Sequence, residues 1–111
     1  MNKVVKAREF LEAQKEGYFE QVCDAAVCSG GVLVMTPDCF LAAVPLVDDP
    51  GALHVVFAMG ELPVIYRVLR ALGCVAIEWR RDFGHSERYG TRRRSLDEWG
   101  RKLGLMERLT K

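Results

Sequence analysis

Apolar residues recur at spacings of three and four over the first part of the chain, which predicts a helix over residues 3–28. The residues that follow this spacing are Val4, Ala7, Phe10, Leu11, Tyr18, Phe19, Val22 and Ala26. Gly17 lies inside this stretch, and a glycine in a helix interior costs about 1 kcal/mol relative to alanine. Two shorter helices that meet at Gly17 are therefore the alternative. Ser29-Gly30-Gly31 is a C-terminal stop signal for the helical stretch.

The pattern then changes to short apolar runs, which predict strands over 32–35, 39–44 and 52–58. Thr36-Pro37-Asp38 is a turn signal, so the first two strands should form an antiparallel hairpin. Pro45 marks the end of the second strand or an edge position. Asp48-Asp49-Pro50-Gly51 is a strong turn before the third strand.

A helical period returns over residues 62–72, with Pro63 in the first turn and Gly73 after the last. Val75 to Trp79 then reads as a fourth strand. The helix between the third and fourth strands is long enough for a crossover. These two strands should therefore be parallel, with a right-handed connection.

After residue 80 the apolar pattern fades, and residues 85–94 are either a fifth strand around Tyr89 or a basic loop. Ser95 with Glu98 has the spacing of a capping box and predicts a C-terminal helix. Its apolar positions are Leu96, Trp99, Leu103 and Met106. The whole order predicts one α+β domain over 1–111. Its sheet should be mixed and mainly antiparallel, with an N-terminal helix and a β-α-β crossover.

Composition limits the class of protein. Of the 111 residues, 50% are hydrophobic, so the chain can bury a core and does not belong to the disordered class. No apolar run reaches the roughly 18–20 residues that a membrane span needs. Charged residues rather than an apolar segment follow Met1, so we expect a cytoplasmic protein with no membrane contact.

The four cysteines are Cys23, Cys28, Cys39 and Cys74, and each lies among apolar residues. Free buried thiols are favoured over disulfides, because a chain of this size folds without covalent links. Cys23-x4-Cys28 is not a standard zinc spacing, and neither histidine accompanies it. We expect no metal site.

A basic segment is the sharpest chemical feature. Net charge is only +1, yet residues 78–111 hold ten Lys or Arg against six Asp or Glu. The arginines concerned are Arg80, Arg81, Arg88, Arg92, Arg93 and Arg94, interleaved with Trp79, Phe83 and Tyr89. Guanidinium groups suit phosphate, and aromatic faces suit bases. The segment fits contact with nucleic acid, with a CoA-like phosphate or with an acidic protein partner. The alternative is a solvated surface segment that pairs with helix carboxylates.

No catalytic residue is singled out by its neighbours, so the catalytic set stays unknown. His54 lies in a strand and is interpreted as structural. Glu78 would act as a general base only if it lined a cleft. Tyr66 and Tyr89 are candidate proton donors, and Cys74 is assigned to packing. His85 lies in a glycine-bounded polar loop and has no obvious carboxylate or serine partner.

The segment formed by Leu53–Ala58, Gly60, the helix at 62–72 and the strand at 75–79 resembles the core of the GNAT acetyltransferase superfamily. In that family an antiparallel meander leads to a strand whose end, with the next helix N-terminus, binds the pyrophosphate of acetyl-CoA. The following strand splays away and opens a slot for the pantetheine arm. The resemblance implies an acyl-CoA N-acetyltransferase-like fold. It implies cofactor contacts at Ala58, Met59, Gly60, Glu61 and Leu62.

Gly30-Gly31, the Thr36-Pro37-Asp38 turn and a strand that ends in Trp79 and Arg81 are similar to short acetyltransferase-like proteins of phages and prophages. That likeness implies a phage or prophage origin. It also implies association with a virion as an alternative to the cytoplasm.

The chain departs from the family at the phosphate loop. Met59 to Pro63 holds a single glycine, Pro63 lacks an N–H donor, and Glu61 puts a negative charge where phosphate would lie. We therefore expect a non-catalytic accessory or binding module without a cofactor. One alternative is an acetyl-CoA-dependent N-acetyltransferase with a reduced loop, and another is nucleic-acid binding through residues 80–94. An exposed edge strand at 32–35 or 39–44 is a candidate contact for a homodimer, which nothing in the sequence requires.

Overall fold

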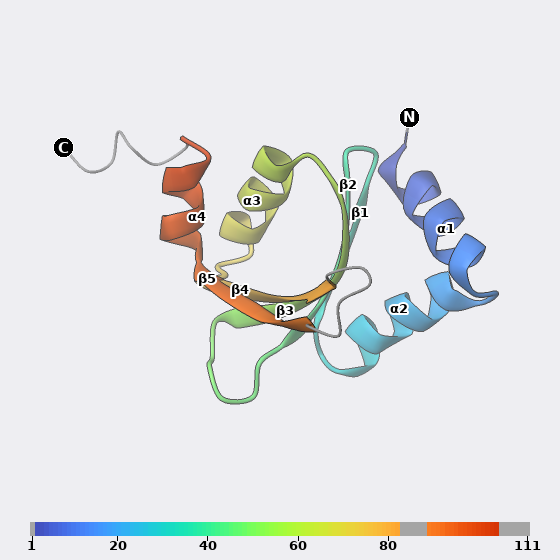
Figure 1. Ribbon diagram of the computed structural model, residues 1–111, viewed down its shortest axis with the longest axis horizontal. Coiled ribbons are helices and arrows are strands. Elements are labelled where there is room, and N and C mark those ends of the chain that lie inside the picture. Colours follow the sequence, from blue (N-terminus) through green and yellow to red (C-terminus); the bar gives the residue numbers. More distant parts are fainter. Residues whose placement is uncertain (1, 83–88, 105–111) are drawn as a thin grey trace.

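Helices cover both faces of one five-stranded sheet in the computed structural model (Figure 1). The structure describes residues 2–82 and 89–104. The elements in chain order are α1 (Lys3–Gln14), α2 (Tyr18–Cys28), β1 (Val32–Thr36), β2 (Cys39–Pro45), β3 (Ala52–Gly60), α3 (Leu62–Ala71), β4 (Ala76–Asp82), β5 (Tyr89–Ser95) and α4 (Leu96–Lys102). The predicted α+β class is confirmed. Among the described helices, none has the length and apolar character that crossing a membrane requires.

The N-terminal helical stretch is broken at Gly17, as the alternative interpretation held. Gly17 has φ +80°, a left-handed conformation that a residue with a Cβ seldom adopts. The Glu12 carboxylate accepts hydrogen bonds from the backbone N–H groups of Gly17 (3.0 Å) and Phe19 (2.8 Å). These bonds satisfy donors at the start of α2 that have no partner within the helix. One carboxylate thus fixes the corner between α1 and α2.

The glycine pair that ends α2 serves two different needs. Gly30 has φ +74°, and the N–H of Gly31 donates to the Ala26 carbonyl over 2.8 Å, which closes the helix end. A Cβ built on Gly31 would lie 2.1 Å from the Ala43 carbonyl oxygen. The turn into β1 therefore passes too close to β2 for any side chain at residue 31.

The strands run in the order β1-β2-β3-β4-β5. Only β3 and β4 are parallel, and α3 connects them. The predicted hairpin and the predicted parallel crossover are confirmed. Residues 85–94 were predicted as either strand or loop, and Tyr89–Ser95 forms a strand. Because β2 pairs with both β1 and β3, the expectation that 39–44 might be an edge is wrong.

A bulge interrupts β3 at Val56. Ala42 of β2 lies opposite Phe57, but Ala43 lies opposite Val55, so Val56 is the extra residue. The bulge shifts the alternation of side chains along β3. Leu53 and Val55 pack with α3, whereas Phe57 packs with α1 and α2. Parallel pairing with β4 runs from Ala52↔Ala76 to Val55↔Trp79, and its last pair adjoins the bulge. The sheet therefore opens between β3 and β4 beyond this point.

Two hydrophobic clusters lie on opposite faces of the sheet. The first joins the sheet to α3 and α4, and its buried members are Cys39, Leu41, Ile65, Tyr66, Leu69, Cys74, Ile77 and Leu96. The second joins the sheet to α1 and α2, and its buried members are Ala7, Leu11, Phe19, Val22, Ala26, Phe40 and Ala42. Strand β2 contributes alternate residues to both clusters, so it is the strand on which the two halves of the core depend.

Candidate functional site

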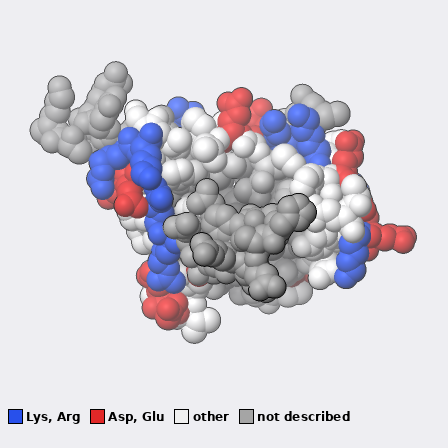
Figure 2. All heavy atoms as spheres, in the orientation of Figure 1, with Lys and Arg blue, Asp and Glu red and all other residues white. Residues whose placement is uncertain are grey.

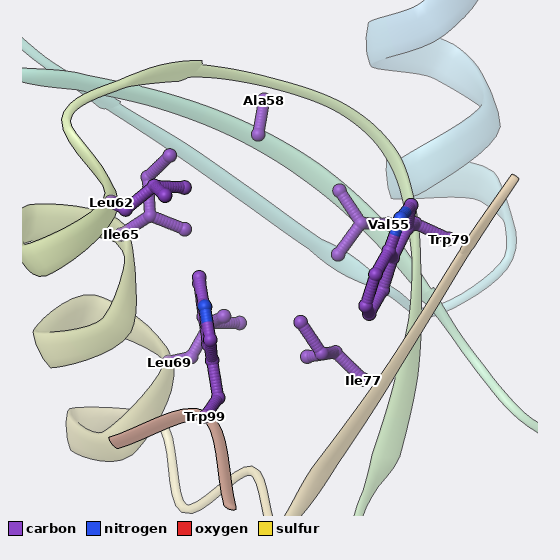
Figure 3. A pocket seen from close by; sticks show the side chains of 8 residues that line it. All are labelled: Val55, Ala58, Leu62, Ile65, Leu69, Ile77, Trp79 and Trp99. Atoms are coloured by element: carbon purple, nitrogen blue, oxygen red, sulfur yellow. The ribbon is translucent and has the colours of Figure 1, made fainter. Parts of the chain in front are cut away.

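A cavity of about 350 Å³ opens between α3, α4 and the diverging strands β3 and β4 (Figure 3). The described residues that line it are all apolar: Val55, Ala58, Leu62, Ile65, Leu69, Ile77, Trp79 and Trp99. The close-up shows both indole rings directed into the space, one from β4 and one from α4. The volume is at the lower end of the range of roughly 300–1,000 Å³ typical of small-molecule sites. The lining is suited to a hydrophobic group.

The cavity exists because of the bulge at Val56. Where β3 and β4 are paired, Val55 and Trp79 lie side by side and both face the helices α3 and α4. Beyond that pair β3 stays with β2, and its next residue on this face is Ala58, which has a small side chain. The short side chain of Ala58 and the divergence of the strands together leave an open space. Trp99 packs edge-on against Tyr66, with 5.8 Å between the ring centroids, and does not fill this space.

A second hollow of about 310 Å³ adjoins the cavity and shares Trp79 and Trp99 with it. Its other residues are Arg94, Lys102 and Leu103. Arg94 Nε lies 3.7 Å from Glu98 Oε1, so part of the local positive charge is balanced. Lys102 has no carboxylate within 4.0 Å in the described part of the chain. The cavity and this hollow therefore border the same two tryptophan side chains, and the hollow has Arg94 and Lys102 in its lining.

The structure places the five expected cofactor residues at the end of β3 and the start of α3. Ala58 lies in β3, as predicted, and Met59 and Gly60 extend that strand, which corrects the prediction that they lie in a loop. Glu61 is the N-cap of α3, and Leu62 is its first residue. Gly60 has φ +147°, and a Cβ there would lie 2.8 Å from the Asp38 carbonyl oxygen. Gly60 is therefore required by its contact with the turn before β2.

The start of α3 offers few donors to an anion. Pro63 is in the first turn and has no N–H, and the N–H of Ile65 donates to the Glu61 carbonyl over 3.0 Å. The first-turn N–H groups that remain are those of Leu62 and Val64. The Glu61 carboxylate accepts no cap hydrogen bond, and it is exposed beside this terminus. The negative charge of Glu61 interacts favourably with the helix dipole at the N-terminus of α3, the place that a bound phosphate would occupy.

The described part of the basic segment forms the paired strands β4 and β5, and the arginine side chains described there are those of Arg93 and Arg94. Strand alternation places Arg93 and Arg94 on opposite faces of the sheet. Arg80 and Arg81 lie in β4 and Arg92 lies in β5, but their side chains are outside the described part of the structure. Arg93 pairs with Asp49 (3.3 Å) and Asp48 (3.9 Å). On the face that Figure 2 shows, the described Lys and Arg side chains lie in more than one group, with Asp and Glu side chains beside them. Arg88 lies outside the described residues.

His54, Glu78 and Arg93 occupy one row across β3, β4 and β5. His54 Nδ1 lies 3.6 Å from Glu78 Oε2, and the two side chains are 27% and 16% exposed. This row is on the face opposite α3 and α4, because the neighbouring residues Leu53 and Ile77 pack with those helices. The interacting histidine and carboxylate are therefore separated from the apolar cavity by the sheet itself.

The other candidates do not meet at one point. Tyr66 is buried against Trp99, and its ring also lies 5.8 Å from the Arg70 guanidinium.

Cys39 and Cys74 are buried free thiols, and burial raises the pKa of both. Cys28 is exposed and Cys23 half-buried, so the expectation of buried thiols holds for only two of the four. His85 lies outside the described residues, and the side chain of Tyr89 is not described. Within the described residues, no three potential metal ligands cluster.

The cavity residues were not predicted as a site. Ala58 and Leu62 were expected near a cofactor, but Val55, Leu69 and Trp99 were interpreted only as core positions. The one signal in the sequence was the unbroken apolar run from Val55 to Met59, which does not alternate as a simple strand would. That run is where the bulge lies.

Comparisons of this chain with models of protein families, with curated proteins and with solved structures find no match.

Proposed function

We propose that this chain is a non-catalytic binding domain of acetyltransferase-like architecture, in which the cavity between β3 and β4 holds a hydrophobic group. The cavity itself carries the proposal. It lies at the divergence of two parallel strands after an antiparallel meander, the position at which the GNAT fold opens its slot. The described residues of its lining include no titratable side chain, so none of them is placed to move a proton.

The start of α3 favours a non-catalytic domain over the acetyltransferase alternative. Gly60 is committed to its contact with Asp38, Pro63 lacks a donor, and Glu61 adds a negative charge. Acetyl-CoA carries several phosphate charges, which need donors and cations at that end of the site. The described cationic side chains near the cavity, Arg94 and Lys102, lie instead beside α4.

The proposed ligand is a medium-length alkyl chain with an anionic end. Each CH₂ group buried in such a cavity contributes about 0.8 kcal/mol. The adjoining hollow would place the anion beside Arg94 and Lys102, with the chain between the two tryptophans. This arrangement uses the apolar lining and the two cationic side chains together.

Thermal unfolding with added ligands tests the proposal, because a ligand that binds only the native state raises Tm by mass action. We expect decanoate to raise Tm, decanol to raise it less, and acetyl-CoA to leave it unchanged. Ala58→Phe should fill the cavity and abolish the decanoate shift. Val47→Phe, at a fully exposed turn position, is the matched control and should keep the shift.

Two results would contradict the proposal. A Tm increase with acetyl-CoA, together with acetyl transfer to an amine, would establish the enzymatic alternative. An equal decanoate shift in the parent chain and in Ala58→Phe would place any binding outside the cavity.

A further inference from the structure

The outer edge of β1 carries backbone groups that the sheet leaves unpaired. A two-residue turn joins Thr36 to Cys39, and residues that flank such a turn form a hydrogen-bonded pair. Thr36, Val34 and Val32 therefore bond to β2, and the N–H and C=O groups of Leu33 and Met35 point away from it. No backbone hydrogen bond joins Leu33 or Met35 to a turn or helix of the described chain.

This edge lacks the features that usually prevent pairing with another strand. Natural edge strands are protected by charged side chains, proline, bulges or a covering element. The sequence Val32–Thr36 has no charge and no proline, and its register with β2 is regular throughout. Met35 is 52% exposed, and Val27, on the helix α2 that packs against β1, is 60% exposed. An apolar, regular strand thus borders solvent.

We propose that β1 pairs antiparallel with β1 of a second copy of this chain, about a twofold axis at Val34. In that register Leu33 lies opposite Met35 of the second copy, and Met35 lies opposite its Leu33. Both positions present their N–H and C=O groups outward, so each such pair exchanges two hydrogen bonds. The strand is therefore complementary to itself, and the two sheets become continuous.

The partner is a second copy because the register closes on itself. An isologous contact of this kind uses the same surface on both subunits and stops at two copies. It also covers Met35 on the face that α1 and α2 occupy. The proposal is independent of the cavity, which lies on the other face of the sheet beyond β3.

Light scattering on a size-exclusion column measures the mass of the parent chain and of three variants. We expect a dimer for the parent chain. Met35→Lys should be monomeric, because it puts a charge into the contact at a position that tolerates exposure. Met35→Pro removes an outward N–H without removing a hydrogen bond to β2, and should also be monomeric. Val47→Lys replaces a fully exposed apolar residue in the turn after β2, outside β1, and should stay dimeric.

Amide hydrogen exchange by NMR locates the contact. In the parent chain the amides of Leu33 and Met35 should be protected, and in Met35→Lys the Leu33 amide should exchange at least tenfold faster. The Val34 amide bonds to β2 and should stay protected in both. A monomeric parent chain, or a dimer in which Leu33 and Met35 exchange freely, would overturn the proposal.

Discussion

A single carboxylate, that of Glu12, holds the corner between the first two helices. Hydrogen bonds from the N–H groups of Phe19 and Gly17 lower the pKa of Glu12, with Phe19 the larger cause. These bonds form only in the folded chain and favour the ionised carboxylate. The stabilisation they give is therefore fully present above the unfolded-state pKa, and it is lost as pH falls through the lower folded-state pKa.

We expect Glu12→Gln to lower the unfolding midpoint at neutral pH, because an amide oxygen is a weaker acceptor than a carboxylate. The difference in unfolding midpoint between Glu12→Gln and the parent chain should become smaller below about pH 4, where the glutamate of the unfolded state becomes protonated. Urea titrations across this range measure it. Glu16→Gln, at an exposed position in the same corner, is the control. A difference that does not change with pH would show that Glu12 acts through packing rather than through its charge.

The roles of several residues could be predicted from the sequence, because those roles depend only on residues close by in the chain. Gly17 and Gly30 mark helix ends through backbone conformations that other residues avoid, and Ser95 caps α4 by accepting from Glu98 N–H over 3.1 Å. The division of the arginines was not visible in the same way. Whether Arg93 and Arg94 lie on one face or on opposite faces depends on whether the segment is a loop or a strand, and pairing with β4 makes it a strand.

At the scale of elements, the bulge in β3 determines both the register and the cavity. Helices, the hairpin and the crossover followed from periodicity and turn residues, which are properties of neighbouring positions. The bulge depends on how β2 and β4 each pair with β3, and Val56 has no sequence feature that distinguishes it from Val55. The cavity could not be predicted for the same reason, since its lining comes from four elements.

Deletion of Val56 tests this account. Without it Leu53 and Val55 would still face α3 and Phe57 would still face α1 and α2, so the chain should fold. Pairing of β3 with β4 should then continue past Trp79 and close the cavity. We expect greater hydrogen-exchange protection for those β4 amides beyond Trp79 that face β3. A folded variant whose β4 amides exchange as in the parent chain would show that the bulge does not cause the opening.

At the scale of the whole molecule, the two hydrophobic clusters depend on one strand. Phe40 and Ala42 of β2 belong to the cluster beneath α1 and α2, and Cys39 and Leu41 belong to the cluster beneath α3 and α4. Phe40 is fully buried, with ring centroids 5.4 Å from Phe19 and 6.1 Å from Phe57. Loss of either cluster would leave β2 exposed on one face, so we infer that the clusters unfold together.

The positions of the two tryptophans make this inference measurable. Trp79 and Trp99 both pack with the α3–α4 cluster, so fluorescence reports that half of the core, whereas far-UV circular dichroism reports all the helices and strands. Phe40→Ala removes a ring from the opposite half and should cost about 3–5 kcal/mol. If the halves are coupled, both signals should shift to the same lower midpoint, whereas Val47→Ala at a fully exposed position should leave both unchanged. The opposite outcome is a dichroism midpoint that falls while the fluorescence midpoint stays at the parent value. That result would mean that the α1–α2 half unfolds separately, and that its unfolding does not destabilise the α3–α4 half through β2.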